Sequence, residues 1–332
     1  MATLLVTGGC GFIGRHLCEA LLARGDIVHV LDDLSTGKRT NLATGASLTV
    51  ADMGRPGVLA AALDGMDACY HLAAIASVER CTRDWTGTHR TNLSATIALF
   101  DAARHRSVPV VYASSAAVYG QGGAAPRREQ DSTAPLSAYG ADKLGCELHA
   151  RVAGHVHGVP TAGLRFFNVF GPGQDPASPY SGVISIFCDR LRRGEPIDIF
   201  GDGQQTRDFV YVADVVAALM AAMNRASIKA PVHNVCTGHA ISVRDLAALV
   251  AELTGGAAHI RPRPARSDEI VHSVGERSQA QGLLGLGRPV DLRHGLRMTL
   301  DWLDSEQPPT VRAVHHLPLG AHLEEVSLEA PI

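Results

Sequence analysis

The sequence predicts an α/β fold: a doubly wound parallel sheet of the Rossmann type, joined to a smaller, interwoven C-terminal lobe. Three observations carry this prediction. A glycine-rich turn separates an apolar run from a helical pattern at the N-terminus, further apolar runs alternate with helical stretches, and a Tyr-x-x-x-Lys pair stands at Tyr139 and Lys143. With 332 residues, 46% of them apolar, the chain can form one large or two closely joined domains.

The first predicted unit is a strand, a turn and a helix. The apolar run Leu4 to Val6 leads into the turn, and a helical pattern that includes Leu17 follows. Glycines permit a tight turn, and backbone N–H groups at a helix N-terminus attract a pyrophosphate. We therefore assign to a dinucleotide site the turn residues Gly8, Gly11, Phe12, Ile13 and Gly14.

The second predicted strand, Ile27 to Leu31, ends in the acids Asp32 and Asp33. Asp32 stands 18 positions beyond Gly14. An acid there hydrogen-bonds the ribose hydroxyls of adenosine and repels a 2′-phosphate. The expected cofactor is therefore NAD rather than NADP.

Later strands also deliver candidate residues at their carboxyl ends, where doubly wound sheets bind ligands. Predicted strands end at Asp52, at Leu72 and at Ala113, and the last leads into Ser114 and Ser115. A helical stretch runs from Asn92 to Arg104; the Asn92 amide either braces the active-site loops or only begins a surface helix. The further cofactor candidates are Asp33, Asp52, Met53, Leu72, Ala73, Ala74 and Asn92.

The catalytic candidates are Ser115, Tyr139 and Lys143. Residues four apart on a helix share a face, so the Lys143 ammonium can favour the charged form of the Tyr139 phenol. Ser115, at a nearby strand end, can relay a proton. Such a set performs reversible alcohol oxidation, in which the phenolate takes a proton while a nicotinamide takes the hydride.

These motifs together resemble the extended short-chain dehydrogenase/reductases, and most closely the NAD-dependent UDP-sugar 4-epimerases. The resemblance runs from about Thr3 to Trp302 and rests on the segments GGCGFIG, HLAA, SSAAVYG, YGADK, RFFNVFGPGQ and GDGQQTRDFVYVADVV. It implies that Tyr139 is the base, that Lys143 holds the nicotinamide ribose and that Ser115 bridges substrate and tyrosine.

The resemblance also implies a UDP-sugar site and a homodimer. Arg207 and Arg266 would contact the diphosphate, Phe200 would flank the uracil, Glu269 would meet the uridine ribose, and Ser273 would leave room for a 2-acetamido group. The full set of implied substrate-binding residues is Ser77, Ser115, Asn168, Phe200, Arg207, Arg266, Glu269 and Ser273.

Two alanines separate this chain from the lyases of the same superfamily. Dehydratases and decarboxylases carry an acid just before the Val-Tyr-Gly, whereas this chain has Ala116 and Ala117, which cannot exchange a proton. A dehydratase or decarboxylase remains the main alternative, followed by a net sugar oxidoreductase and a non-enzymatic nucleotide sensor. The sugar is open among glucose and galactose, their N-acetylated forms and the uronates.

Composition narrows the remaining function classes. A net charge of −3 favours neither nucleic acid nor an anionic membrane, and the chain has no run of 18 apolar residues. The start passes directly into the glycine turn, which argues against a signal peptide. Seven scattered cysteines without a Cys-x-x-Cys favour a cytoplasmic protein with free thiols, and the 16 histidines form no metal motif.

The expected domains follow from these segments. An NAD-binding domain spans residues 1–166 and is completed by 209–237. The substrate lobe comprises 167–208 and 238–304, and a proline-punctuated tail covers 305–332.

Overall fold

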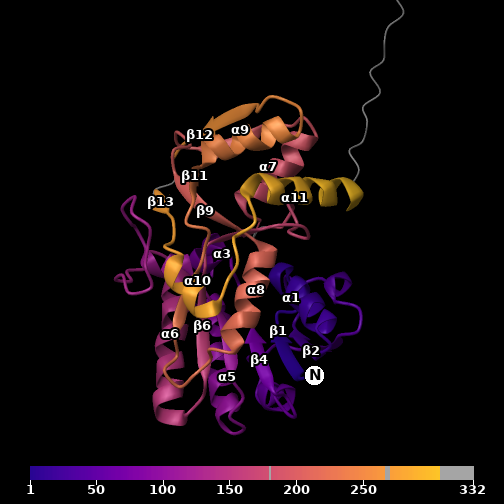
Figure 1. Ribbon diagram of the computed structural model, residues 1–332, viewed down its shortest axis with the longest axis vertical. Helices are drawn as coiled ribbons and strands as arrows, with labels where there is room; N and C mark the ends of the chain where they lie inside the picture. Colours follow the sequence, from indigo (N-terminus) through magenta and orange to yellow (C-terminus); the bar gives the residue numbers. More distant parts are fainter. Residues whose placement is uncertain (179–180, 266–269, 307–332) are drawn as a thin grey trace, which may run out of the picture.

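A parallel sheet of seven strands forms the larger body of the protein (Figure 1). The computed structural model describes residues 1–178, 181–265 and 270–306. The strand order is β10-β6-β5-β4-β1-β2-β3: β2 and β3 follow on one side of β1, and β4, β5, β6 and β10 follow on the other. This order is that of a doubly wound sheet, so the predicted fold class is confirmed. The strands are β1 (Thr3–Thr7), β2 (Ile27–Asp32), β3 (Ser47–Val50), β4 (Ala68–His71), β5 (Val110–Ser115), β6 (Thr161–Phe166) and β10 (Val232–Val235).

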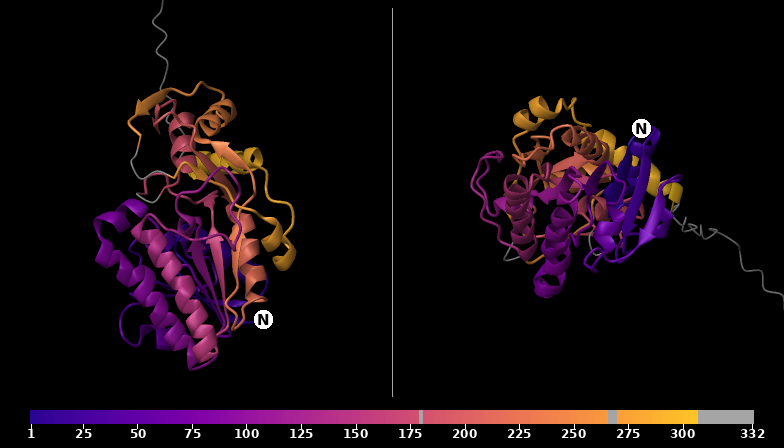
Figure 2. Two further views of the ribbon diagram at one scale, coloured as in Figure 1. Left: turned by 90° about the vertical axis from the view of Figure 1, so that its left-hand side faces the viewer. Right: turned by 90° about the horizontal axis from the view of Figure 1, so that it is seen from below.

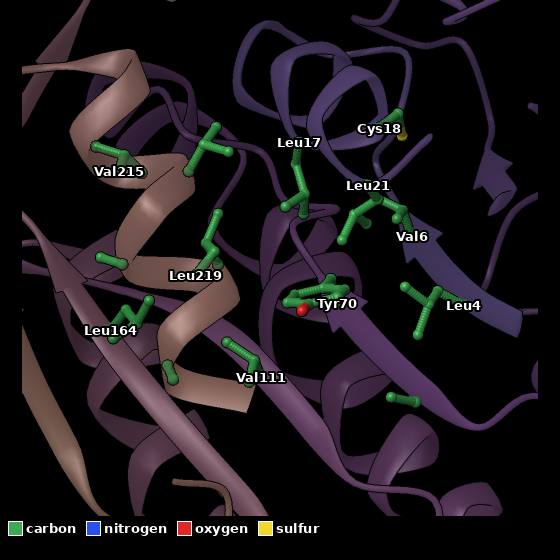
Figure 3. Packing of buried hydrophobic residues seen from close by; sticks show 14 of the residues in the cluster. Leu4, Val6, Leu17, Cys18, Leu21, Tyr70, Val111, Leu164, Val215 and Leu219 are labelled. Atoms are coloured by element: carbon green, nitrogen blue, oxygen red, sulfur yellow. The ribbon is translucent and has the colours of Figure 1, made fainter. Parts of the chain in front are cut away.

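Helices cover both faces of this sheet, which explains why its strands are apolar without alternation. In β1, Leu4 and Val6 pack under α1 (Phe12–Ala23) and α8 (Val212–Met223), as the neighbouring core residues in Figure 3 show. Leu5 points the other way, into the core under α2 (Val58–Ala62), α5 (Ala95–Arg104) and α6 (Ala138–His157). The side view in Figure 2 shows α5 and α6 together on one side of the sheet.

A smaller lobe stands above the carboxyl edge of the sheet (Figure 1). Its core gathers Phe170, Phe187, Tyr211, Leu246 and Leu296. Strand β9 pairs with β7, β11 and β13, and β8 pairs with β12. The elements are β7 (Asn168–Phe170), α7 (Val183–Arg192), β8 (Ile197–Phe200), β9 (Thr206–Tyr211), β11 (Ala240–Ser242), α9 (Val243–Leu253), β12 (Ile260–Arg263), β13 (His272–Ser273) and α11 (Leu292–Glu306).

The two parts are interwoven along the chain. After β7, α7, β8 and β9 it returns to the large body through α8 and β10, and then re-enters the smaller lobe at β11. Residues 209–211, which the domain prediction assigns to the NAD-binding part, complete β9 of the small sheet. The first two residues of the predicted tail are helical, because α11 runs to Glu306.

Short elements occupy the connections. The helical stretch predicted from Asn92 begins earlier, in a π-helical turn that continues directly into α5. The remaining elements are η1 (Arg39–Asn41), α3 (Val78–Arg83), α4 (Trp85–His89), the π-helical η2 (Arg90–Ser94), η3 (Ala116–Tyr119) and α10 (Ser278–Leu284). None of the helices in the described ranges is long and apolar enough to cross a bilayer.

Candidate active site

A cavity of about 1100 Å³ lies where the carboxyl edge of the large sheet meets the smaller lobe. Its walls combine the β1–α1 turn and the ends of β2, β4 and β5 with residues of the smaller lobe, including Phe170, Phe209 and Trp302. Almost all predicted cofactor residues line it: Gly8, Gly11, Phe12, Ile13, Gly14, Asp32, Asp33, Asp52, Met53, Leu72, Ala73, Ala74, Tyr139 and Lys143. Asn92 is the exception.

The glycine turn fits a pyrophosphate for a steric and an electrostatic reason. A Cβ on Gly14 would lie 2.2 Å from the Gly8 carbonyl oxygen, and one on Gly8, where φ is +73°, would lie 2.7 Å from the Ala73 nitrogen. Backbone therefore packs on backbone here. Gly11, the N-cap of α1, offers no capping side chain, so the first N–H groups of the helix are left for an anion in the cavity.

Asp32 is held firmly at the end of β2, in the wall of the cavity. Its side chain accepts hydrogen bonds from the backbone nitrogens of Cys10, at 3.0 Å, and Leu34, at 2.9 Å. Burial, reinforced by the charge of Asp33, raises the carboxyl pKa against the opposing effect of these bonds. The carboxylate is thereby fixed in orientation, and its remaining lone pairs suit the ribose hydroxyls of a dinucleotide.

Ser115, Tyr139 and Lys143 all line this cavity. Ser137 caps α6 by accepting a bond from Gly140 N at 3.1 Å, which places Tyr139 in the first turn. Lys143 Nζ donates to the Ala113 carbonyl at 2.9 Å and lies 5.8 Å from the centroid of the Tyr139 ring. Ser115 Oγ accepts a bond from Ala117 N at 3.1 Å, which leaves its hydroxyl hydrogen available to a substrate.

Asn92 lies behind the cavity wall and braces it. It is 1% exposed. Its side-chain oxygen accepts from Ile75 N at 2.8 Å, and its Nδ2 donates to Ile75 O at 3.1 Å. Since Ile75 lines the cavity, the structure agrees with the bracing interpretation of Asn92, and its contact with a cofactor stays a prediction.

His71 extends this brace to the glycine turn. Thr96 Oγ1 donates to the Asn92 carbonyl, so it accepts from His71 Nε2 at 2.9 Å, and His71 Nδ1 is left to accept from Thr7 Oγ1 at 2.7 Å. Burial, with a contribution from the charge of Lys143, lowers the His71 pKa to about 3. The imidazole is therefore neutral. Sequence reasoning missed this role of His71. The signal that could have indicated it is the position of His71 at the end of a buried apolar strand.

Sequence reasoning also missed an ion pair at the cavity. Lys38 Nζ lies 2.6 Å from Asp175 Oδ2, and both residues line the cavity. This contact joins the loop after β2 to the loop after β7 and lowers the Asp175 pKa. Their separation by 137 residues hides the pair from any sequence pattern.

The predicted substrate residues are more dispersed than the cofactor residues. Asn168 and Ser115 line the cavity. Ser77 Oγ instead caps α3 by accepting from Arg80 N at 3.1 Å. Phe200, Arg207 and Ser273 lie on β8, β9 and β13 of the smaller lobe and are not among the residues that line the described cavity, while Arg266 and Glu269 lie outside the described residues.

Two of these dispersed residues are neighbours. Ser273 on β13 pairs in register with Arg207 on β9. Arg207 Nη1 donates to the Ile270 carbonyl at 2.8 Å. Their roles toward a substrate stay predictions.

A glycine turn, an acid at the end of β2 and a Ser–Tyr–Lys set at the carboxyl edge of one parallel sheet define an extended short-chain dehydrogenase/reductase. Within this class, the chain belongs to the NAD dependent epimerase/dehydratase family, whose model matches residues 4–236. The predicted family and the predicted cofactor, NAD, are thereby confirmed.

Relatives of known name cover almost the whole chain. A putative UDP-glucose 4-epimerase of Methanocaldococcus jannaschii is 34% identical, covering 90% of this chain and 98% of its own. A crystal structure of UDP-glucose 4-epimerase with UDP-glucose from Thermotoga maritima is 32% identical with a TM-score of 0.87, covering 92% and 99%. The NAD complex of the Thermus thermophilus UDP-glucose 4-epimerase is 34% identical with a TM-score of 0.85, covering 90% and 98%.

Other relatives carry names of lyases. UDP-glucuronic acid decarboxylase 1 of Arabidopsis thaliana is 30% identical, covering 90% of this chain and 69% of its own. An NDP-hexosamine 5,6-dehydratase of tunicamycin biosynthesis is also 30% identical, with a TM-score of 0.84 and coverage of 93% and 99%. The family therefore includes epimerases, decarboxylases and dehydratases.

The neutral state of His71 predicts a loss of stability in acid. The unfolded chain binds a proton at His71 below pH about 6.5 and the folded protein only below about 3. This contribution to stability is therefore complete above pH 6.5 and is lost as the pH falls toward 3, by about 2 kcal/mol at pH 5. Urea unfolding of wild type and His71→Gln at pH 7 and 5 measures it.

Between pH 7 and pH 5, the free energy of unfolding of His71→Gln should fall by about 2 kcal/mol less than that of the wild type, because glutamine does not titrate. His157→Gln, on an exposed residue of α6, is the matched control and should keep the wild-type pH dependence. Equal losses in wild type and His71→Gln would contradict a neutral buried imidazole.

Proposed function

We propose that the protein is an NAD-dependent UDP-hexose 4-epimerase, which oxidises the C4 alcohol to a transient ketone and reduces it again from the other face. One observation carries the proposal. Ser115, Tyr139 and Lys143 share a cavity with the dinucleotide turn, and the two residues after Ser115, where a lyase would need an acid, are Ala116 and Ala117.

In this proposal Tyr139 is the base that removes the proton from the 4-hydroxyl group. Ser115 donates its hydroxyl hydrogen to the sugar oxygen and holds it toward the phenol. Lys143, anchored on the Ala113 carbonyl, stabilises negative charge on the Tyr139 oxygen as that charge forms. When bound, NAD accepts the hydride from C4 and returns it. The 4-keto sugar must turn between the two transfers, and Tyr139 then gives the proton back.

A decarboxylase or dehydratase is the second candidate, because relatives with those names match the chain at 30% identity. Both alternatives share the first oxidation and then need an acid or base beside the new ketone. Ala116 and Ala117 are the first two residues of the short turn η3, and their methyl groups cannot exchange a proton. NMR time courses with UDP-glucose, UDP-GlcNAc and UDP-glucuronate separate the candidates, since a decarboxylase releases CO2, a dehydratase releases water, and epimerisation alone gives an isomer of the substrate.

We also infer a homodimer in the cytoplasm. Helix α6 exposes an apolar row at spacings of four residues: Leu148 (52%), Val152 (48%) and Val156 (62%). Such a row on an outer helix suits a second copy of the chain. The free thiols of all seven buried cysteines support a reducing compartment.

Removing the Tyr139 hydroxyl should remove the base. Tyr139→Phe should reduce epimerase turnover by roughly 10²–10⁴-fold at unchanged NAD content, as expected for a positioned acid–base group. Tyr70→Phe is the matched control, because Tyr70 lies in the core under α1 and α8 and outside the cavity lining. Wild-type turnover by Tyr139→Phe would exclude Tyr139 as the base.

Sugar size should depend on Ser273. In this proposal Ser273, which pairs in register with Arg207, faces the sugar, and its hydroxymethyl group leaves space for a 2-acetamido substituent that a tyrosine would fill. Ser273→Tyr should therefore lose turnover of UDP-GlcNAc at least tenfold more than turnover of UDP-glucose, and Ser273→Ala should retain both. Equal effects on both substrates would remove Ser273 from the sugar site.

The dimer should depend on the exposed row of α6. Wild-type protein should sediment at twice the mass of one chain, and Val152→Lys should shift it toward the monomer because a charge cannot be buried there without a partner. Met298→Lys, at a residue of α11 that is 40% exposed, is the control and should remain dimeric. A monomeric wild type would refute the dimer.

A further inference from the structure

A buried ion pair lies directly behind the catalytic set. Glu147 on α6 and Arg165 on β6 are 4% and 6% exposed and meet through two bonds, Nε to Oε1 at 2.9 Å and Nη2 to Oε2 at 2.7 Å. Hydrogen bonding to Glu147 raises the Arg165 pKa although burial opposes it. Because desolvation offsets most of the attraction in such a pair, its contribution to stability does not by itself explain its presence. The geometry that the pair fixes is the more informative property.

Glu147 connects the two elements that carry the catalytic residues. It stands one turn beyond Lys143 and two turns beyond Tyr139, on the same face of α6. Its Oε1 also accepts a hydrogen bond from Ser114 Oγ at 2.5 Å, and Ser114 immediately precedes Ser115 on β5. One carboxylate thus ties the helix of the base to the strand end of the serine.

Arg165 extends the connection beyond the strand. Its Nη1 donates to Tyr119 Oη at 2.8 Å and to the Glu129 carbonyl at 3.0 Å. Tyr119 in turn donates to Asn234 Oδ1 at 2.7 Å. Burial, opposed by Arg165, raises the Tyr119 pKa to about 12, so the phenol stays neutral and keeps the hydrogen that it donates.

The last bonds of this network reach the smaller lobe. Asn234 Nδ2 donates to the Arg127 carbonyl at 2.8 Å. The Arg127 backbone then pairs with the segment that follows β13, its N–H donating to Val274 O at 2.9 Å and its carbonyl accepting from Glu276 N at 2.7 Å. The ion pair is therefore bonded to α6, to β5 and, through Tyr119 and Asn234, to the strand end that carries Ser273.

We propose that Glu147 and Arg165 are positioning residues that align Ser115 with Tyr139 for hydride transfer, an inference that rests on the proposed function. Neither residue is among those that line the described cavity. They act through Ser114, through the common helix face and through the bonds to the smaller lobe. A misplacement of the reacting groups by about 1 Å can reduce a rate by roughly 10²-fold, so a rigid link at this position affects the rate constant more than substrate binding.

The test measures single-turnover reduction of bound NAD, followed by NADH absorbance after mixing with a UDP-sugar. Oxidation of the C4 alcohol precedes both epimerisation and the lyase reactions, so the readout does not depend on which product forms. Glu147→Gln and Arg165→Lys should slow this step by about 10- to 100-fold, with the sugar concentration at half-saturation changed less than threefold and NAD content retained.

A double variant and a control separate alignment from simple charge balance. Glu147→Gln with Arg165→Gln leaves no uncompensated charge, so its melting temperature should recover relative to the single variants while hydride transfer stays slow. The control is Asp189→Asn, which breaks the ion pair of Asp189 with Arg192 in the smaller lobe. It should lower the melting temperature and leave hydride transfer unchanged.

Two results would overturn the proposal in distinguishable ways. If hydride transfer recovers together with melting temperature in the double variant, or is unchanged in Glu147→Gln, the pair is only structural while the proposed function stands. If the wild type epimerises none of the UDP-sugars in the NMR time courses, the proposed function fails and the positioning role fails with it.

Discussion

The close approach of the glycine turn to the end of β4 is the constraint on which the rest of the site depends. No side chain fits between Gly8 and Ala73 or between Gly14 and Gly8, so α1 starts directly at the edge of the sheet. That placement turns the first N–H groups of α1 toward the cavity, beside Asp32 at the end of the neighbouring strand β2. The apolar layers under α1 and α8 then hold the turn in place.

Several buried polar groups lie behind the cavity. Asn92 and His71 brace the loop and the turn on the proposed cofactor side, and Glu147 with Arg165 joins the helix and strand of the proposed catalytic set. Each such group costs free energy when it leaves water, and only complete hydrogen bonding offsets that cost. The bonds are directional, whereas apolar packing is not. The polar network therefore fixes geometry where chemistry needs it.

The fold does not distinguish an epimerase from the decarboxylases and dehydratases to which this chain is also similar. In the proposed mechanism the oxidation of C4 precedes all three reactions, which then differ in whether they need a further acid or base beside the ketone. Ala116 and Ala117 follow directly on Ser115 in the turn η3. The absence of a titratable group at these two positions is the chemical basis for preferring epimerisation.

The sequence by itself determined what depends on local order along the chain: the strand–turn–helix at Gly8 to Gly14, the acid at Asp32, and the Tyr139–Lys143 spacing. These features specify the fold class and the cofactor side because each is set by neighbours within one turn or one strand. The tertiary structure alone decided the rest. It placed Asn92 behind the wall, made Ser77 a helix cap, joined Lys38 to Asp175 and brought Glu147 to Arg165 and Ser114. Such contacts depend on how elements far apart in the chain pack together, and no local pattern encodes that distance.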